Sequence, residues 1–225
     1  MTQPSVLITG ASGNMGSAIV KKMQSENYQV YATARNATGL EGAEVTAVDL
    51  TNETAVNDYI TNIISKDTNL KTAILLVGGF ATGDLKNTDG AALQKMYKLN
   101  FETAYFAVRA LLHHFEANGG GHFLLVSARS ALLAQEAQHA VAYSLSKSLV
   151  LYLAEIINAY GKSKGIRASV IIPGTIDTPQ NRQAMPRADF SKWTSTEAIA
   201  DAIYFLLTDA GEHLRETVLK MYNES

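Results

Sequence analysis

The sequence contains no cysteine, and this absence excludes several kinds of chemistry at once. Disulfide bonds, thiolate nucleophiles and cysteine-ligated metal sites all need a residue that the chain lacks. The histidines do not replace it, because no two of them stand at a metal-binding helical spacing with an acidic partner: His113, His114, His122, His139 and His213. We therefore expect no metal site, and we expect these histidines at the surface or in loops.

The chain also has little net charge and no long apolar run. Its 19 Lys and Arg residues balance 21 Asp and Glu residues, which gives a net charge of -2. Such a balance predicts no general attraction to nucleic acid or to an anionic membrane. No 18-residue apolar run occurs, and the start of the chain lacks the pattern of a signal peptide. We expect a cytoplasmic protein that binds a small molecule or another protein.

Linkers, repeats and low-complexity tracts are absent too. The 225 residues include only four prolines, and the length is at the upper end for one domain. One domain over residues 1–225 is the simplest interpretation. The long irregular connection runs from Asp177 to Trp193. Because long irregular loops in compact domains are often lids, residues 177–194 are a candidate substrate lid.

What the sequence does contain is a regular alternation of strands and helices. Seven β-rich apolar runs are predicted as strands: Ser5 to Thr9, Gln29 to Ala34, Glu44 to Val48, Thr72 to Val77, His122 to Ser127, Arg167 to Ile172 and Glu216 to Met221. Five amphipathic stretches are predicted as helices: Met15 to Ser25, Glu53 to Ser65, Asp89 to Ala117, Ala140 to Tyr160 and Ser195 to Thr208. This order predicts an α/β fold with a doubly wound, mostly parallel, seven-stranded Rossmann-type sheet, which binds ligands at the carboxyl ends of its strands.

A glycine-rich turn joins the first strand to the first helix. Glycine permits a tight bend and a close approach of the backbone to a pyrophosphate, and the helix start attracts anions. We predict that six residues of this turn bind a dinucleotide: Gly10, Ser12, Gly13, Asn14, Met15 and Gly16.

The end of the second strand bears on the choice of cofactor. An acid there binds the ribose 2'-hydroxyl of NAD, whereas an arginine accommodates the 2'-phosphate of NADP. The chain has Arg35 and no acid, so NADP is favoured over NAD, unless Arg35 is only a solvated loop residue. After the third strand, Asp49 and Leu50 are predicted to lie beside the cofactor, with Asp49 near the adenine, and Thr51 is predicted to cap the next helix.

Tyr143 and Lys147 are one helical turn apart, at the start of a helix that follows the fifth strand. A tyrosine and a lysine at this spacing are often only a packed ring and a lysine whose stem lies along apolar surface. Together with the glycine turn, the pair indicates a protein family. Thr-Gly-Ala-Ser-Gly-Asn-Met-Gly at 9–16, with Tyr-Ser-Leu-Ser-Lys at 143–147, resembles the short-chain dehydrogenase/reductase family.

The resemblance covers nearly the whole chain. It includes Gly78-Gly79, where the family often has Asn-Ala-Gly, then Asn100, and the segment Pro173 to Pro179. Gly78-Gly79 and the Ile-Asp-Thr-Pro segment look closer to the dihydropteridine-reductase-like branch. The resemblance also implies further cofactor contacts at Gly78, Gly79, Pro173, Gly174, Ile176 and Thr178.

Membership of this family would imply an oxidoreductase that moves a hydride between NADP(H) and a small carbonyl or alcohol. Tyr143 would be the general acid or base. The Lys147 ammonium would stabilise the phenolate and bind the nicotinamide ribose, and Asn100 would hold a water of the proton relay. The family also forms homodimers or homotetramers, for which the apolar helices Asp89 to Ala117 and Ala140 to Tyr160 would be suited.

The chain departs from the family pattern at two places. The family serine usually lies 13 residues before the tyrosine, which gives Ser130, yet strand register places that position at Ala128 with Ser127 just before it. We prefer Ser127 as the hydroxyl donor, because a strand end is more rigid than a loop. The glycines at 10, 13 and 16 follow a spacing more usual in epimerase-like members, so an isomerase with bound dinucleotide is an alternative. A non-catalytic dinucleotide sensor is another, although it would not need Tyr143, Lys147 and Asn100.

Overall fold

The computed structural model describes residues 3–34 and 40–224. These residues form a seven-stranded sheet in the order β3-β2-β1-β4-β5-β6-β7, and every neighbouring pair is parallel. The strands are β1 (Ser5–Thr9), β2 (Gln29–Thr33), β3 (Glu44–Thr46), β4 (Thr72–Leu75), β5 (Gly121–Val126), β6 (Ile166–Pro173) and β7 (Val218–Met221). The predicted doubly wound α/β fold is confirmed.

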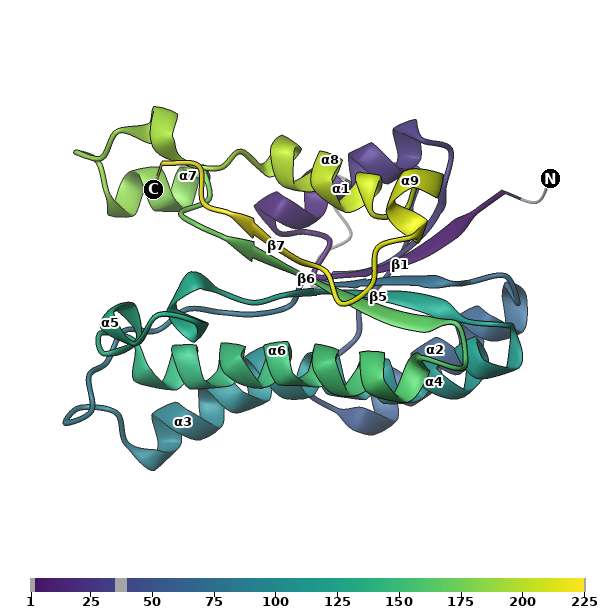
Figure 1. Ribbon diagram of the computed structural model, residues 1–225, viewed down its shortest axis with the longest axis horizontal. Coiled ribbons are helices and arrows are strands. Elements are labelled where there is room, and N and C mark those ends of the chain that lie inside the picture. Colours follow the sequence, from purple (N-terminus) through teal and green to yellow (C-terminus); the bar gives the residue numbers. More distant parts are fainter. Residues whose placement is uncertain (1–2, 35–39, 225) are drawn as a thin grey trace.

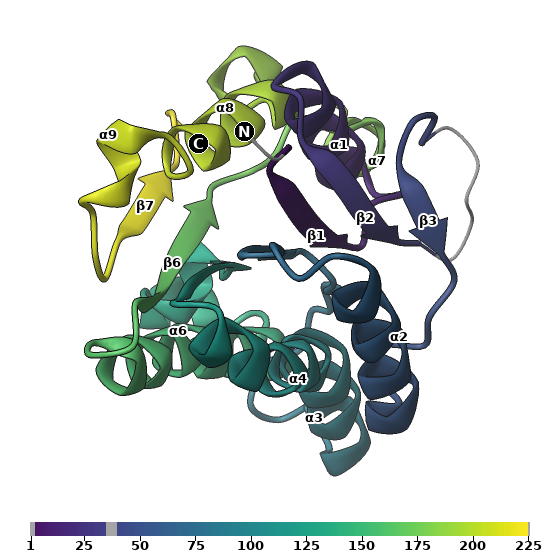
Figure 2. The same cartoon turned by 90° about the vertical axis from the view of Figure 1, so that its right-hand side faces the viewer.

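Helices cover both faces of the sheet (Figures 1 and 2). One face carries α1 (Asn14–Ser25), α8 (Thr196–Phe205) and α9 (Asp209–Glu212), and the other carries α2 (Glu53–Lys66), α3 (Gly90–Tyr97), α4 (Thr103–Ala117) and α6 (Val141–Gly161). Successive strand residues point to opposite faces, so Leu7 and Ile8 of β1 belong to two different apolar cores. This two-sided burial explains why the strands read as continuous apolar runs.

The helix predicted from Asp89 to Ala117 is interrupted. A π-helical turn, Lys98–Glu102, separates α3 from α4, and it contains Asn100. The wider turn changes the direction of side chains without ending the helical course, and such turns are frequent at functional sites. The interruption leaves the apolar periodicity largely intact, which is why the sequence pattern did not reveal it.

Several predicted boundaries and caps were wrong for local reasons. β7 begins at Val218 rather than Glu216, because Glu216 has a positive φ of 56° that a strand cannot contain. The cap of α2 is Asn52, whose side chain accepts from the Ala55 N–H, and the Thr51 hydroxyl donates to Asp49 instead. Three short helices were not predicted, because four to six residues show no clear periodicity: α5 (Ala134–Ala137), α7 (Pro179–Ala184) and α9.

Two histidines are buried rather than at the surface or in loops. His114 in α4 contacts the carbonyl oxygen of Leu70 at 3.0 Å, and His122 in β5 contacts the Ser169 hydroxyl at 2.9 Å. Burial lowers the pKa of His122 to about 3, so this side chain is neutral in the folded protein. The Ser169 hydroxyl on β6 satisfies Nε2, while Nδ1 is buried without a hydrogen-bond partner among the described residues.

Candidate active site

The turn between β1 and α1 has the geometry of an anion-binding loop. Gly10 has a φ of +70°, and a side chain at Gly16 would overlap the Gly10 carbonyl oxygen, so the chain passes through this bend only with glycines at both places. Within the described residues no side chain caps α1 at Gly13, which leaves first-turn N–H groups for an external anion. Ser12 and Asn14 are exposed beside them. The turn therefore fits a pyrophosphate.

Of the other predicted cofactor residues, Arg35 lies outside the described residues. Asp49 is exposed, and its Oδ1 accepts from the Thr51 N–H at 2.9 Å and from the Thr51 hydroxyl at 2.7 Å. These bonds hold the pKa of Asp49 below its usual range. Leu50 is buried and belongs to the core beneath α2.

Tyr143 and Lys147 lie in the first turns of α6, and burial shifts the pKa of both side chains. The Lys147 Nζ donates to the Val126 carbonyl oxygen at 2.9 Å, and burial lowers the pKa of its ammonium to about 8. Burial raises the pKa of the Tyr143 phenol to about 12. The resemblance implies a phenolate stabilised by the Lys147 ammonium, whereas in this structure the loss of water is the cause that acts on Tyr143, and it favours the neutral phenol. The phenol is accordingly protonated at neutral pH.

Asn100 ties the loop after β4 to the first turn of α6. Its Oδ1 accepts from the Gly79 N–H at 2.8 Å, and its Nδ2 donates to the Gly79 carbonyl oxygen at 3.1 Å and to the Ser146 hydroxyl at 2.9 Å. Ser146 in turn donates to the Tyr143 carbonyl oxygen at 2.7 Å. Asn100 is only 1% exposed, so these bonds are shielded from water. They fix the backbone of Tyr143 relative to the loop.

Ser146 was not predicted as a site residue. The signal was present, because Ser146 stands between Tyr143 and Lys147 on the side of α6 that faces the core. A buried hydroxyl needs a partner, but the sequence does not say that this partner is Asn100, 46 residues earlier.

Gly78 lies against both Asn100 and Lys147. A Cβ at Gly78 would be 2.7 Å from Asn100 Oδ1 and 3.0 Å from Lys147 Nζ. The structure therefore brings four of the predicted residues, Tyr143, Lys147, Asn100 and Gly78, together at the carboxyl edge of the sheet. This is the edge at which α/β sheets bind ligands.

The two candidate serines differ in their surroundings. The Ser127 hydroxyl is buried and donates to the Lys147 carbonyl oxygen at 2.8 Å, which pins α6 to the end of β5. The Ser130 hydroxyl is buried without a hydrogen-bond partner among the described residues. Ala128 at the strand register position has no hydroxyl to offer.

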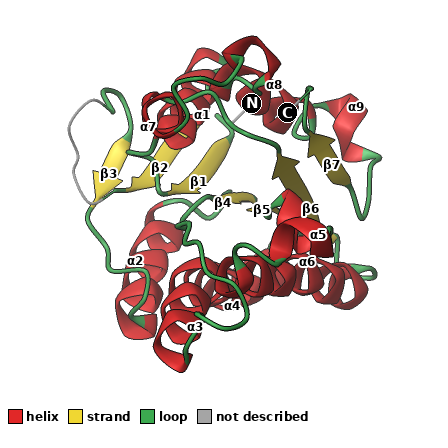
Figure 3. Cartoon of the chain, turned by 90° about the vertical axis from the view of Figure 1, so that its left-hand side faces the viewer, coloured by secondary structure: helices red, strands yellow, loops and turns green. Residues whose placement is uncertain are grey.

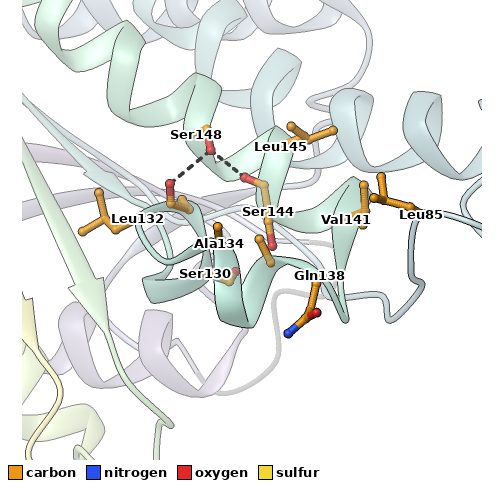
Figure 4. A pocket seen from close by; sticks show the side chains of 11 residues that line it. Leu85, Ser130, Leu132, Ala134, Gln138, Val141, Ser144, Leu145 and Ser148 are labelled. Carbon is orange, nitrogen blue, oxygen red and sulfur yellow. Dashed lines mark hydrogen bonds between the residues drawn. The ribbon is translucent and has the colours of Figure 1, made fainter.

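Ser130 lines a pocket of about 430 Å³ beside α6 (Figure 4). Ser144 and Ser148 form one wall, and the Ser148 hydroxyl donates to the Ser144 carbonyl oxygen at 2.9 Å. Residues one position apart point about 100° apart around a helix, so this wall is not the side of α6 that carries Tyr143 and Lys147. Neither of those residues lines the pocket. The pocket therefore adjoins α6 on a side next to the one that carries the reactive pair.

The candidate lid contains more regular structure than the irregular connection that the sequence predicts. Its two ends meet in a parallel β-bridge between Ile176 and Thr194, and Thr178 caps α7 by accepting from the Asn181 N–H. Pro173 and Gly174 precede it, where the Gly174 N–H donates to the Met221 carbonyl oxygen. α7 lies beside α1 (Figure 3), and the amide of Asn14 donates to Gln180 Oε1 at 2.5 Å. The segment thus reaches the glycine turn.

Over residues 3–34 and 40–224, no group of three or more His, Asp or Glu side chains is arranged to hold a metal ion. In the same ranges, none of the helices is both long enough and apolar enough to cross a membrane.

Comparison with known proteins agrees with this geometry. The chain is 26% identical over 213 residues to an uncharacterized oxidoreductase of Staphylococcus haemolyticus, covering 90% of each chain. It is 26% identical over 207 residues to the dihydropteridine reductase of Dictyostelium discoideum, covering 88% of this chain and 85% of the relative. Among solved structures, ElxO with NADP bound has a TM-score of 0.89 at 22% identity, covering 98% of this chain and 97% of ElxO. Residues 4–189 match the family described as short chain dehydrogenase, and the chain belongs to this family.

Proposed function

We propose that the protein transfers a hydride between NADP(H) and a small carbonyl or alcohol, with Tyr143 as the general acid or base. The observation that carries the proposal is the cluster of Tyr143, Lys147, Asn100 and Gly78 at the sheet edge that also holds the glycine turn. Relatives that are named as oxidoreductases support the reaction class.

The chemistry that the chain itself supplies is proton transfer. A carbonyl that accepts a hydride also needs a proton, and the Tyr143 phenol is protonated at neutral pH, as a phenol with a pKa of about 10 is, and burial raises that pKa further, to about 12. Lys147 places a positive charge beside the alkoxide that forms, and Asn100 with Ser146 holds the Tyr143 backbone in place. The bound nicotinamide supplies the hydride. Residues of the glycine turn, together with Asp49, Gly78, Gly79, Gly174 and Thr178, would hold that cofactor.

In this proposal Ser127 positions α6, the helix that carries Tyr143 and Lys147. Its hydroxyl already donates to the Lys147 carbonyl oxygen, so it orients α6, and donation to a substrate would require that bond to break. Its role as the hydroxyl donor stays a prediction, with Ser130 as the alternative.

NADP as the preferred cofactor rests on Arg35 and on the absence of an acid next to it in the sequence. The NADP bound in ElxO, which is similar along almost its whole length, supports the same choice. We also propose a cytoplasmic homodimer or homotetramer, for which the exposed apolar side chains of α6 are the structural argument.

The glycine spacing keeps an isomerase that retains its dinucleotide as a second candidate. Release of oxidised cofactor in proportion to turnover distinguishes a dehydrogenase from such an enzyme. A sensor without turnover is disfavoured by the bonds that orient Tyr143, since cofactor binding alone does not need them.

The central test is Tyr143→Phe, which removes one oxygen and keeps the packed ring. We expect NADPH binding to persist while turnover of aldehydes, ketones, quinones and pterins falls by about 100- to 10,000-fold. The matched control is Tyr152→Phe on the same helix. The Tyr152 ring is exposed, and Tyr152 stands five positions after Lys147, on another side of the helix. Near wild-type turnover in the Tyr143 variant would exclude the proposed mechanism.

Titration of the wild type and of Arg35→Ala with NADPH and with NADH tests the choice of cofactor. NADPH should bind more tightly than NADH, and Arg35→Ala should remove the difference. If both nucleotides bind equally well to the wild type and to the variant, Arg35 does not bind a 2'-phosphate.

A further inference from the structure

We propose that Phe80 determines substrate specificity and that it selects carbonyl compounds whose carbonyl is conjugated to a flat ring. The inference rests on the proposed function for the position of the carbonyl, and it adds the substrate class. The Phe80 ring meets the Tyr143 ring edge-on at 5.0 Å between centroids, although Phe80 is 68% exposed.

Phe80 is held on a backbone that is fixed on both sides. On one side Asn100 binds both the N–H and the carbonyl oxygen of Gly79. On the other side Gly83 pairs with the start of α6: its N–H donates to the His139 carbonyl oxygen at 3.0 Å, and its carbonyl oxygen accepts from the Val141 N–H at 2.8 Å. An exposed aromatic on a mobile loop would need no explanation. Here the loop is anchored to the helix that carries Tyr143.

The backbone on both sides of Phe80 is therefore held beside the helix that carries Tyr143. An edge-on pair covers only part of each ring and leaves aromatic surface open to a third ring. The loop also runs past the ammonium, because Gly78 lies against Lys147. A substrate whose oxygen meets the Tyr143 hydroxyl has its adjoining group within reach of the Phe80 ring.

The Phe80 ring determines which chemical group of the substrate binds best beside it. Ring pairs are favourable at centroid distances of about 4.5–7 Å, in offset or edge-on arrangements, beyond what apolar burial alone gives. A conjugated carbonyl lies in the plane of its ring, so one rigid flat body can engage both Tyr143 and Phe80. A saturated ring of equal size has no π-face and is puckered. Aromatic ketones, aromatic aldehydes and quinones are the class that fits.

The test uses two ketones that differ only in ring unsaturation, acetophenone and cyclohexyl methyl ketone. Their dissociation constants are measured by ligand-observed NMR titration on the protein saturated with NADP, so that no turnover is needed. We expect acetophenone to bind about two- to tenfold more tightly to the wild type. Phe80→Leu, which keeps apolar bulk, should abolish the preference, and Phe80→Trp should keep it. Phe205→Leu is the matched control, since Phe205 is an exposed phenylalanine on α8, on the opposite face of the sheet.

Equal affinity of the two ketones for the wild type, no measurable binding of either, or an unchanged ratio in Phe80→Leu would overturn the inference. Circular dichroism melts of the three variants report whether each is folded. Turnover of the same ketones with NADPH is a separate arm. A normal binding preference without any hydride transfer would contradict the proposed function and leave the role of Phe80 intact.

Discussion

At the residue scale, the site is held by bonds from side chains to backbone. Asn100 binds the Gly79 backbone, Ser146 binds the Tyr143 carbonyl oxygen, and Ser127 binds the Lys147 carbonyl oxygen. Backbone partners cannot change rotamer, so such bonds fix where α6 and the loop after β4 sit. The reactive pair is thereby positioned without a bond between Tyr143 and Lys147 themselves.

Gly78→Ala is predicted to impair this arrangement. The new Cβ would lie 2.7 Å from Asn100 Oδ1, and Asn100 has little freedom to move because three hydrogen bonds hold it. A displacement of about 1 Å at a catalytic centre commonly costs on the order of 100-fold in rate, so kcat should fall by about that factor. Steady-state kinetics with the best substrate of the screen measures it.

The control for this prediction is Gly90→Ala. Gly90 begins α3, and a side chain there would meet nothing within 4 Å beyond its neighbours in the helix, so kcat should stay at the wild-type value. Similar kinetics for the two alanine variants would show that the close approach of Gly78 to Asn100 has no effect on catalysis.

At the element scale, α7 and the segment around it link the substrate side of the site to the cofactor side. Gln180 of α7 contacts Asn14 at the start of α1, and Arg182 forms a two-pronged ion pair with Asp177 at 2.6 and 2.7 Å. Trp193 is buried beneath, with its ring 4.8 Å from that of Phe190. The segment is held at its base by the Ile176–Thr194 bridge and has an exposed tip, and its role as a lid stays a prediction.

We predict that NADPH and substrate slow tryptic cleavage of residues 177–194, where Arg182, Arg187 and Lys192 are exposed. The Asn14 contact should contribute, so Gln180→Ala should be cleaved faster than the wild type in the presence of NADPH. Gln94→Ala, at an exposed position of α3, serves as the control. Equal protection with and without ligands would mean that the segment is a fixed wall.

At the scale of the whole molecule, one side of α6 is left exposed by the residues that the structure describes. Leu145, Leu149, Tyr152 and Ile156 follow each other at spacings of three and four residues and are between 38% and 62% exposed. Tyr97 of α3 and Tyr105 of α4 add exposed aromatic surface on the neighbouring helices. A contiguous apolar stripe of this kind is typical of a contact between subunits.

Pairing of two copies through this stripe should therefore depend on α6. We expect the wild type to be a dimer or tetramer at micromolar concentration, and Ile156→Glu to shift it to the monomer, because the contact would bury an unpaired charge. Light scattering after gel filtration measures both. A monomeric wild type contradicts the prediction, and Phe205→Glu on α8 should leave the mass unchanged.

The sequence by itself determined the features that repeat along the chain or lie close together in it. Continuous apolar runs that alternate along the chain with helical stretches predicted the parallel sheet, because strands buried on both faces are apolar throughout. The spacing of Tyr143 and Lys147 put them on one helix face, and the glycines between β1 and α1 marked a turn that only small residues allow.

The tertiary structure decided what meets across long sequence separations. The link from Gly79 through Asn100 to Ser146 and the contact of Phe80 with Tyr143 join residues tens of positions apart, and they exist because the carboxyl ends of β4 and β5 are neighbours in the sheet. The direction of the Tyr143 pKa was likewise decided by burial, which only packing creates. Local patterns state which element a residue belongs to, whereas the packing of elements sets its partners and its exposure to water.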